Sequence, residues 1–186
     1  ENFASQCKQQ ANDIIEWDTV NWFKFIKVIE KNNFDFNGKK VLEVGGRHGG
    51  LSLYYAMNGA EVLCSDVCSP FPTEKAITLH KKYNVQDKIQ YADIDVLDVP
   101  ERYYGNFDIV TFKSVLGSGF IGDANEPRAV ENIKKCLKPK GYVIFAENMV
   151  ASLLHSFCRK HARKYRWNYH TEESIFSLFN ANFSLV

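Results

Sequence analysis

The segment from Lys39 to Asp66 constrains the fold more than any other part of the chain. It opens with a short apolar run at 41–44, interrupted only by Glu43, which is typical of a buried parallel strand. Four glycines follow within six residues, at 45–50. Apolar residues then recur at helical spacing as far as Asn58-Gly59, and 61–65 is a second strand pattern. The segment therefore predicts a β-α-β unit.

This unit predicts a ligand site at one edge of a sheet. A right-handed crossover places its two strands side by side and parallel, so the glycine loop and Asp66 meet at the carboxyl edge, where open α/β sheets bind ligands. Glycines tolerate positive φ and let a ligand approach bare backbone. A carboxylate such as that of Asp66 can accept hydrogen bonds from two neighbouring hydroxyl groups. The alternative is a glycine-rich turn that binds nothing.

The glycine spacing favours one class of cofactor over another. The dinucleotide fingerprint G-x-G-x-x-G fails at Arg47 when it starts from Gly45, and at His48 when it starts from Gly46, which disfavours a nicotinamide oxidoreductase. The pattern Glu43-x-Gly45-x-x-x-Gly49, with an acid closing the next strand, instead resembles the first motif of the class I S-adenosylmethionine-dependent methyltransferases. Arg47 departs from the glycine that is commoner at the middle of that family's loop.

The resemblance implies a Rossmann-like, doubly wound α/β fold with a mainly parallel sheet and strand order 3-2-1-4-5-(7)-6. Later parts of the chain supply matching patterns. We predict strands at 89–92, 106–112 and 142–146, helices at 74–83, 126–137 and 172–180, a turn at 138–141, and a sixth strand from 183. We expect residues 1–17 to form a helical extension and 18–186 the cofactor-binding domain. The family's final antiparallel strand would fall beyond residue 186, so we expect a truncation or a strand from elsewhere.

The start of that domain is a predicted helix that runs to Lys31, with Asp18 as its N-cap. Trp17 and Trp22 lie where family members often carry a helix that closes over the cofactor. Large aromatic residues at helical spacing usually pack in a core, so we favour that interpretation over direct cofactor contact.

S-adenosylmethionine, leaving as S-adenosylhomocysteine, is the cofactor that the resemblance implies. The loop would wrap its methionine part, Asp66 would bind the ribose hydroxyls, and an acid after the third strand would accept the adenine amine. Counting back from Pro100 favours Asp95 over Asp93 for that role, although both alternate to the same face. The predicted cofactor-binding residues are Glu43, Gly45, Gly46, Arg47, His48, Gly49, Asp66, Val67, Asp95, Val96 and Lys113. We predict no metal site.

The implied reaction is an in-line displacement at the sulfonium methyl, for which the protein aligns the acceptor and excludes water. The Asn-Pro-Pro-Tyr signature of enzymes that methylate amino groups is absent after the fourth strand, which favours an oxygen acceptor. A hydroxyl would benefit from a base, and the candidates are Glu147, His155 and His48, in that order. The alternative is a catalytically inactive module that binds S-adenosylmethionine or S-adenosylhomocysteine.

A basic run suggests the acceptor. Five positive charges fall within eight residues, on Arg159, Lys160, Arg163, Lys164 and Arg166. We expect a small-molecule acceptor, with a phosphate-bearing sugar as the specific hypothesis, because the chain also resembles methyltransferases of bacterial surface-polysaccharide synthesis. A solvated helix face or peripheral contact with an acidic membrane are the alternatives. The formal charge of only +1 argues against nucleic acid.

Composition bounds the remaining possibilities. With 186 residues, 45% hydrophobic and 24% charged, the chain has the material for one globular core. No apolar run is long enough to span a membrane and no signal-peptide pattern is present. The five cysteines form an odd set without a Cys-x-x-Cys pair, which predicts reduced thiols and a cytoplasmic enzyme. The patterns do not predict an oligomeric state.

Overall fold

The computed structural model of the chain describes residues 8–150, 168–180 and 183–184. Within these ranges the strands form one sheet of five parallel strands in the order β3-β2-β1-β4-β5. The strands are β1 (Lys40–Val44), β2 (Glu61–Asp66), β3 (Ile89–Asp93), β4 (Phe107–Lys113) and β5 (Leu137–Ala146). The predicted fold class and the order of the first five strands are confirmed.

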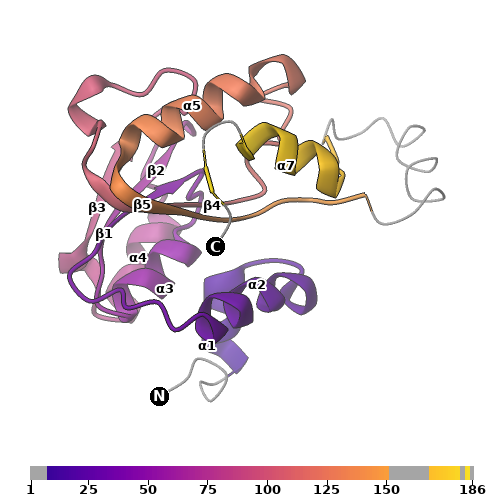
Figure 1. Cartoon of the computed structure of the whole chain (residues 1–186). Helices are drawn as coiled ribbons and strands as arrows, with labels where there is room; N and C mark the ends of the chain where they lie inside the picture. Colours follow the sequence, from indigo (N-terminus) through magenta and orange to yellow (C-terminus); the bar gives the residue numbers. More distant parts are fainter. Residues whose placement is uncertain (1–7, 151–167, 181–182, 185–186) are drawn as a thin grey trace.

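Helices cover both faces of the sheet, giving three layers (Figure 1). One face carries the helices from the first part of the chain, and the opposite face carries the later ones. The helices are α1 (Lys8–Ile15), α2 (Thr19–Lys31), α3 (Gly50–Met57), α4 (Glu74–Lys82), α5 (Glu126–Cys136) and α7 (Glu172–Asn180). None of the helices in the described ranges combines the length and the apolar character needed to cross a bilayer.

The N-terminal helices share the core of the first face. Ile14 and Ile15 of α1 are almost fully buried, together with Tyr55 of α3 and Ile26 of α2. Gly50 begins α3 directly against the carbonyl oxygen of Ile14, where a Cβ atom would overlap it. This close approach of two backbones requires glycine. Within the described residues, α1 therefore packs in the same core as α2 and α3.

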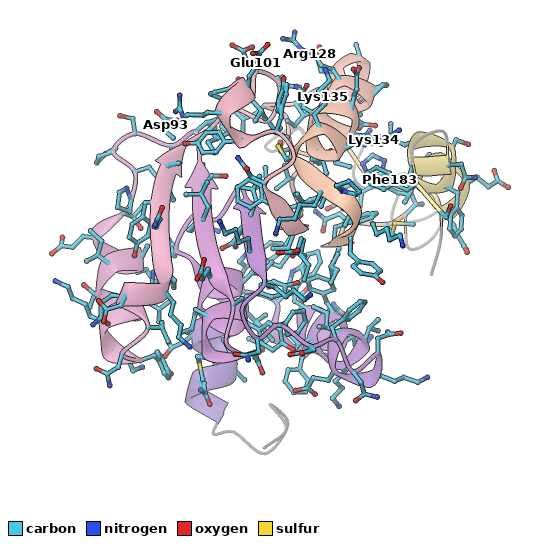
Figure 2. The ribbon with its side chains drawn as sticks, turned by 60° about the vertical axis from the view of Figure 1, so that its left-hand side comes forward. Asp93, Glu101, Arg128, Lys134, Lys135 and Phe183 are labelled. Atoms are coloured by element: carbon cyan, nitrogen blue, oxygen red, sulfur yellow. The ribbon has the colours of Figure 1, made fainter. Side chains whose placement is uncertain are left out.

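The core of the opposite face is built by α5 and α7. Val130 and Ile133 of α5 are buried against the sheet. Phe145 of β5 stacks between Phe112 of β4 and Phe179 of α7, with ring centroids 4.9 and 4.6 Å away. The side chains of Arg128, Lys134 and Lys135 of α5 point outward (Figure 2). This amphipathic pattern is the one that predicted the helix.

Three local expectations need correction. Asp18 stands at the N-cap position of α2, but its φ is 45° and its carboxylate accepts hydrogen bonds from the Asn21 side chain rather than from a backbone N–H. The predicted turn at 138–141 is part of β5, which begins directly after α5, and a register shift between Phe107 and Ile109 accommodates it. Phe183 and Ser184, the described residues of the predicted sixth strand, are not in a strand, and Phe183 packs against Phe179 of α7 (Figure 2).

Candidate functional site

A cavity of about 600 Å³ opens at the carboxyl edge of the sheet, where β1 to β4 end. The predicted glycine loop and the segments that follow β2, β3 and β4 all contribute to its lining, together with the turn between α1 and α2. The lining residues are Glu16, Trp17, Glu43, Val44, Gly45, Gly46, Arg47, Leu51, Asp66, Val67, Cys68, Ile94, Asp95, Val96, Leu97, Lys113, Ser114, Val115, Ser118, Phe120 and Ile121. Most of these side chains are apolar, as in typical small-molecule sites.

The floor of the cavity is formed by Glu43 and the first two glycines of the loop. The Glu43 carboxylate is 4% exposed and accepts hydrogen bonds from the backbone N–H of Ser52, at 2.8 Å, and from the Ser52 hydroxyl. A Cβ atom on Gly46 would lie 2.6 Å from the Cys64 sulfur, and one on Gly45 would lie 2.6 Å from Val115 Cγ2. A side chain at either position would therefore collide with Cys64 or Val115.

Asp66 holds the loop in place at the end of β2. Its Oδ2 accepts a hydrogen bond from the backbone N–H of Arg47 at 2.7 Å, and its Oδ1 accepts one from the backbone N–H of Cys68 at 3.0 Å. Arg47 adopts a left-handed φ of 49°, at the position where the resembled family more often has glycine. Each carboxylate oxygen keeps a lone pair for a ligand, because an ionised carboxylate has about four acceptor sites. The side chain is thus oriented before any ligand arrives.

The segment after β3 supplies the far wall of the cavity. Asp95 and Val96 line it, whereas Asp93 is not among the lining residues. Asp95 Oδ1 accepts a hydrogen bond from the backbone N–H of Leu97 at 2.8 Å, which fixes the carboxylate beside the apolar Ile94 and Val96. This placement agrees with the preference for Asp95 over Asp93.

Two residues predicted in the cofactor loop lie outside this cavity. His48 lines a second cavity between α1 and α4, and its Nδ1 lies 3.2 Å from Thr73 Oγ1. Gly49 lies against the buried His80, whose Nε2 donates to the Gly49 carbonyl oxygen at 2.9 Å while Nδ1 accepts from the Tyr91 hydroxyl. Burial lowers the pKa of His80, which favours this neutral form. Gly49 is therefore required by packing against a histidine ring.

Neither of the first two candidates for a catalytic base is seen at the cavity. Glu147 follows β5, but it is not among the residues that line the cavity. Its Oε1 accepts hydrogen bonds from the backbone N–H groups of Val115 and Leu116, both at 2.7 Å, and its buried Oε2 has no hydrogen-bond partner among the described residues. Burial raises the pKa of Glu147 to about 7. His155 and the basic run at 159–166 lie outside the described residues.

The turn between α1 and α2 brings residues that the sequence did not assign to the site. Glu16 lines both cavities, and Trp17 lines the one at the carboxyl edge of the sheet. Trp22 is 8% exposed in the core, which confirms the core interpretation for that tryptophan. Phe120, on the glycine-rich segment after β4, lines the cavity while remaining 88% exposed. In the sequence, Glu16 and Trp17 stand out only as an acid and an aromatic residue between two helical patterns, which does not predict a place in the site.

The buried carboxyl of Glu43 makes stability depend on pH. Burial raises the pKa of Glu43 to about 7 from 4.5, so the folded state holds a proton that the unfolded state releases above pH 4.5. The contribution of this proton to stability is complete below pH 4.5 and is lost as the pH rises to about 7. This titration lowers the free energy of unfolding by up to about 3 kcal/mol between pH 4.5 and 7, and we expect Glu43→Gln, which cannot titrate, to lack that decrease. Urea unfolding of wild type and Glu43→Gln at pH 5 and pH 7.5 measures the free energy of unfolding. If it changes with pH by the same amount in both proteins, Glu43 is not the group responsible.

The chain matches one protein family over most of its length. Residues 16–183 match the model of a family described as "Methyltransferase domain". A protein named ubiquinone biosynthesis O-methyltransferase from Acinetobacter baylyi is 31% identical over 130 residues, which covers 68% of this chain and 48% of that protein. The chain thus spans about half the length of the curated relative that it matches.

Solved structures agree on the fold. The PH0226 protein from Pyrococcus horikoshii superposes with a TM-score of 0.74 at 16% identity, covering 92% of this chain and 85% of that one. Phosphoethanolamine N-methyltransferase 2 from Haemonchus contortus, solved with phosphomonomethylethanolamine and S-adenosylhomocysteine, gives a TM-score of 0.69 at 19% identity and covers 87% of this chain and 36% of that one. At such identities the likeness extends to the fold alone.

Proposed function

This chain belongs to the methyltransferase-domain family, and we propose that it transfers a methyl group from S-adenosylmethionine to a hydroxyl group of a small molecule. The observation that carries the proposal is the convergence of the Gly45-Gly46 loop, Asp66 and Asp95 on one cavity of about 600 Å³. This volume falls within the range of pockets that enclose small ligands. Because the chain spans about half of its curated relative, the activity is proposed for this region.

The cavity offers complementary groups for each part of the cofactor. The bare backbone of Gly45 and Gly46 would accommodate the methionine part. Asp66, fixed by two backbone hydrogen bonds, would accept from the ribose hydroxyls, and Asp95 would accept from the adenine amine. Val96 would cover the ring. When bound, the sulfonium supplies an activated methyl group, and the protein's task is to align the acceptor with it and exclude water.

The acceptor is proposed from the relatives' names and from the character of the cavity. The curated relatives are named O-methyltransferases, which agrees with the oxygen acceptor expected from the sequence. The cavity lining is predominantly apolar, including Trp17, Leu51 and Phe120. We therefore propose a hydroxyl on a largely apolar acceptor. The phosphorylated-sugar hypothesis rested on a resemblance to surface-polysaccharide methyltransferases, which the names of the curated relatives do not repeat, and on the basic run at 159–166, which lies outside the described residues.

The structure suggests a different role for Glu147 from that of a base. Its side chain is not among the residues that line the cavity, and its Oε1 is held by the backbone N–H groups of Val115 and Leu116. We propose that Glu147 instead holds the segment after β4, whose Val115 and Ser118 line the cavity. Alignment of the acceptor would then account for most of the catalysis.

Calorimetry and a transfer assay together test this function. We expect S-adenosylmethionine and S-adenosylhomocysteine to bind and NAD to give no heat of binding. Transfer of a labelled methyl group is then measured with catechol and with a nucleotide-linked hexose, and we expect label in catechol. Label in the hexose alone would support a sugar acceptor and contradict the apolar one. Cofactor binding without transfer to either acceptor would favour the inactive binding module, and failure to bind would overturn the proposal.

A further inference from the structure

Lys113, the last residue of β4, is a cation in an unusual setting. Its Nζ donates a hydrogen bond to the carbonyl oxygen of Ile15 at 2.6 Å. The same Nζ lies 5.2 Å from the centroid of the Trp17 ring and 5.7 Å from that of Trp22. The two rings are themselves in edge contact, at 5.2 Å. The ammonium group thus ties the end of a central strand to the turn between α1 and α2.

That turn contains two residues in a strained backbone conformation, although the backbone N–H groups of Glu16 and Trp17 donate to the carbonyl oxygens of Asn12 and Ile15. Glu16 has a φ of 68° and Asp18 a φ of 45°, a left-handed region that side-chain-bearing residues rarely adopt. Such conformations persist where the surrounding structure fixes them. On one side of the turn, α1 is secured by Asp13, which accepts from Lys82 at 2.5 Å and from the Tyr83 hydroxyl at 2.8 Å. At the turn itself, the Lys113 hydrogen bond provides the connection to the sheet.

The turn supplies a distinct part of the cavity wall. The groups that the proposed function assigns to the cofactor come from the ends of β1, β2 and β3. Lys113, which the sequence also predicted to bind the cofactor, is not among them. Glu16 and Trp17 come from the turn, and Lys113 and Ser114 come from the end of β4. An acceptor must approach the methyl group from a side that the cofactor leaves open. The parts of the lining that are not assigned to the cofactor include the wall made by Glu16 and Trp17, and the segment after β4 that contributes Val115, Ser118 and Phe120.

We propose that Lys113 is a positioning residue that fixes Glu16 and Trp17 as the acceptor-facing wall of the cavity. The proposal rests on the proposed function, since it assigns the acceptor side of the same site. Burial lowers the pKa of Lys113, while the nearby carboxylates of Glu16 and Glu43 favour its charged form. A charged donor between two aromatic faces makes a stronger anchor than a neutral one.

The first test measures the solvent accessibility of Trp17 in the protein without any ligand. Trp22→Phe and Trp167→Phe leave Trp17 as the single tryptophan, and acrylamide quenching of its fluorescence reports how well it is covered. We expect Lys113→Met to raise the quenching constant of Trp17 by about twofold or more, since the Ile15 carbonyl and the ring lose their anchor. Lys113→Arg, which keeps a charged donor, should restore most of the shielding. Lys24→Met, an exposed lysine of α2, serves as the matched control.

The second test separates the two ligands. In Lys113→Met we expect the KM for catechol to rise by roughly tenfold or more, the size associated with loss of a charge-assisted hydrogen bond, while the Kd for S-adenosylhomocysteine stays within about threefold. Lys113→Gln replaces the methionine variant if that protein does not fold. Unchanged Trp17 quenching would overturn the proposal. So would a loss of S-adenosylhomocysteine affinity as large as the rise in KM, because Lys113 would then be binding the cofactor directly.

The two tests also keep this proposal apart from the proposed function. If the wild-type chain binds no S-adenosylmethionine, the function fails, while the quenching result still decides whether Lys113 positions Trp17. If methyl transfer occurs but quenching and KM are both unchanged in Lys113→Met, the function stands and the positioning role is wrong.

Discussion

Replacing Asp66 with alanine is expected to weaken binding of S-adenosylmethionine by about 1.5 to 3 kcal/mol, or roughly 10- to 150-fold. Two losses combine in this change. The ribose hydroxyls lose their charged acceptor, and the backbone N–H groups of Arg47 and Cys68 lose the carboxylate that holds the loop. Isothermal titration of wild type and variant measures the difference directly.

Asp93 provides the matched control for this substitution. It is the last residue of β3, lies beside Asp66 in the parallel register, and is absent from the cavity lining. Asp93→Ala is expected to leave the cofactor affinity unchanged. Asp66→Asn separates the two losses, since it keeps an acceptor oxygen but removes the charge, and an intermediate affinity is expected. Equal affinity of Asp66→Ala and wild type would show that the ribose is bound elsewhere.

Replacing Gly45 with valine is expected to reduce cofactor binding by about a hundredfold or more while the fold persists. The new Cβ would lie 2.6 Å from Val115 Cγ2, at the floor of the cavity, and the φ of 68° adds about 1 to 2 kcal/mol of strain. The loop lies at the edge of the sheet, outside both buried clusters. Circular dichroism establishes whether the variant is folded, and calorimetry measures its affinity.

Gly105 makes it possible to separate steric exclusion from backbone strain. It has a similar φ of 65°, but a Cβ atom there would meet nothing within 4 Å, and it does not line the cavity. Gly105→Val should therefore show a comparable loss of stability with normal cofactor binding. A folded Gly45→Val protein that binds S-adenosylmethionine normally would remove the glycine loop from the site.

The sequence by itself determined the β-α-β unit and the position of Asp66 at the end of its second strand. Both follow from local periodicity and from the right-handed crossover, which do not depend on the detailed packing of distant segments. The order of the first five strands was implied by the resemblance to class I methyltransferases. The same reasoning placed Gly45 and Gly46 beside Asp66, and the family resemblance added Val67, Asp95 and Val96. Each lies in the cavity lining.

Only the tertiary structure decided where individual side chains point. His48 and Gly49 share the loop with Gly45, yet they face α1 and His80, since the left-handed residues of the loop turn its second half away from the cavity. Glu147 follows a strand at the expected edge, but its carboxylate is taken up by backbone N–H groups more than 30 residues away in the chain. Neither outcome follows from a local pattern.

The turn at Glu16 and Trp17 is the clearest case of a position that no local sequence pattern predicts. Its place over the cavity depends on a hydrogen bond between Lys113 and Ile15, which are 98 residues apart, and on the approach of the Ile14 carbonyl to Gly50. Such contacts arise when separately formed elements pack, because the partner of a buried polar group is whichever group packing brings within reach. The sequence therefore determined the edge at which a ligand binds, and the packing of α1 and α2 decided what closes that edge.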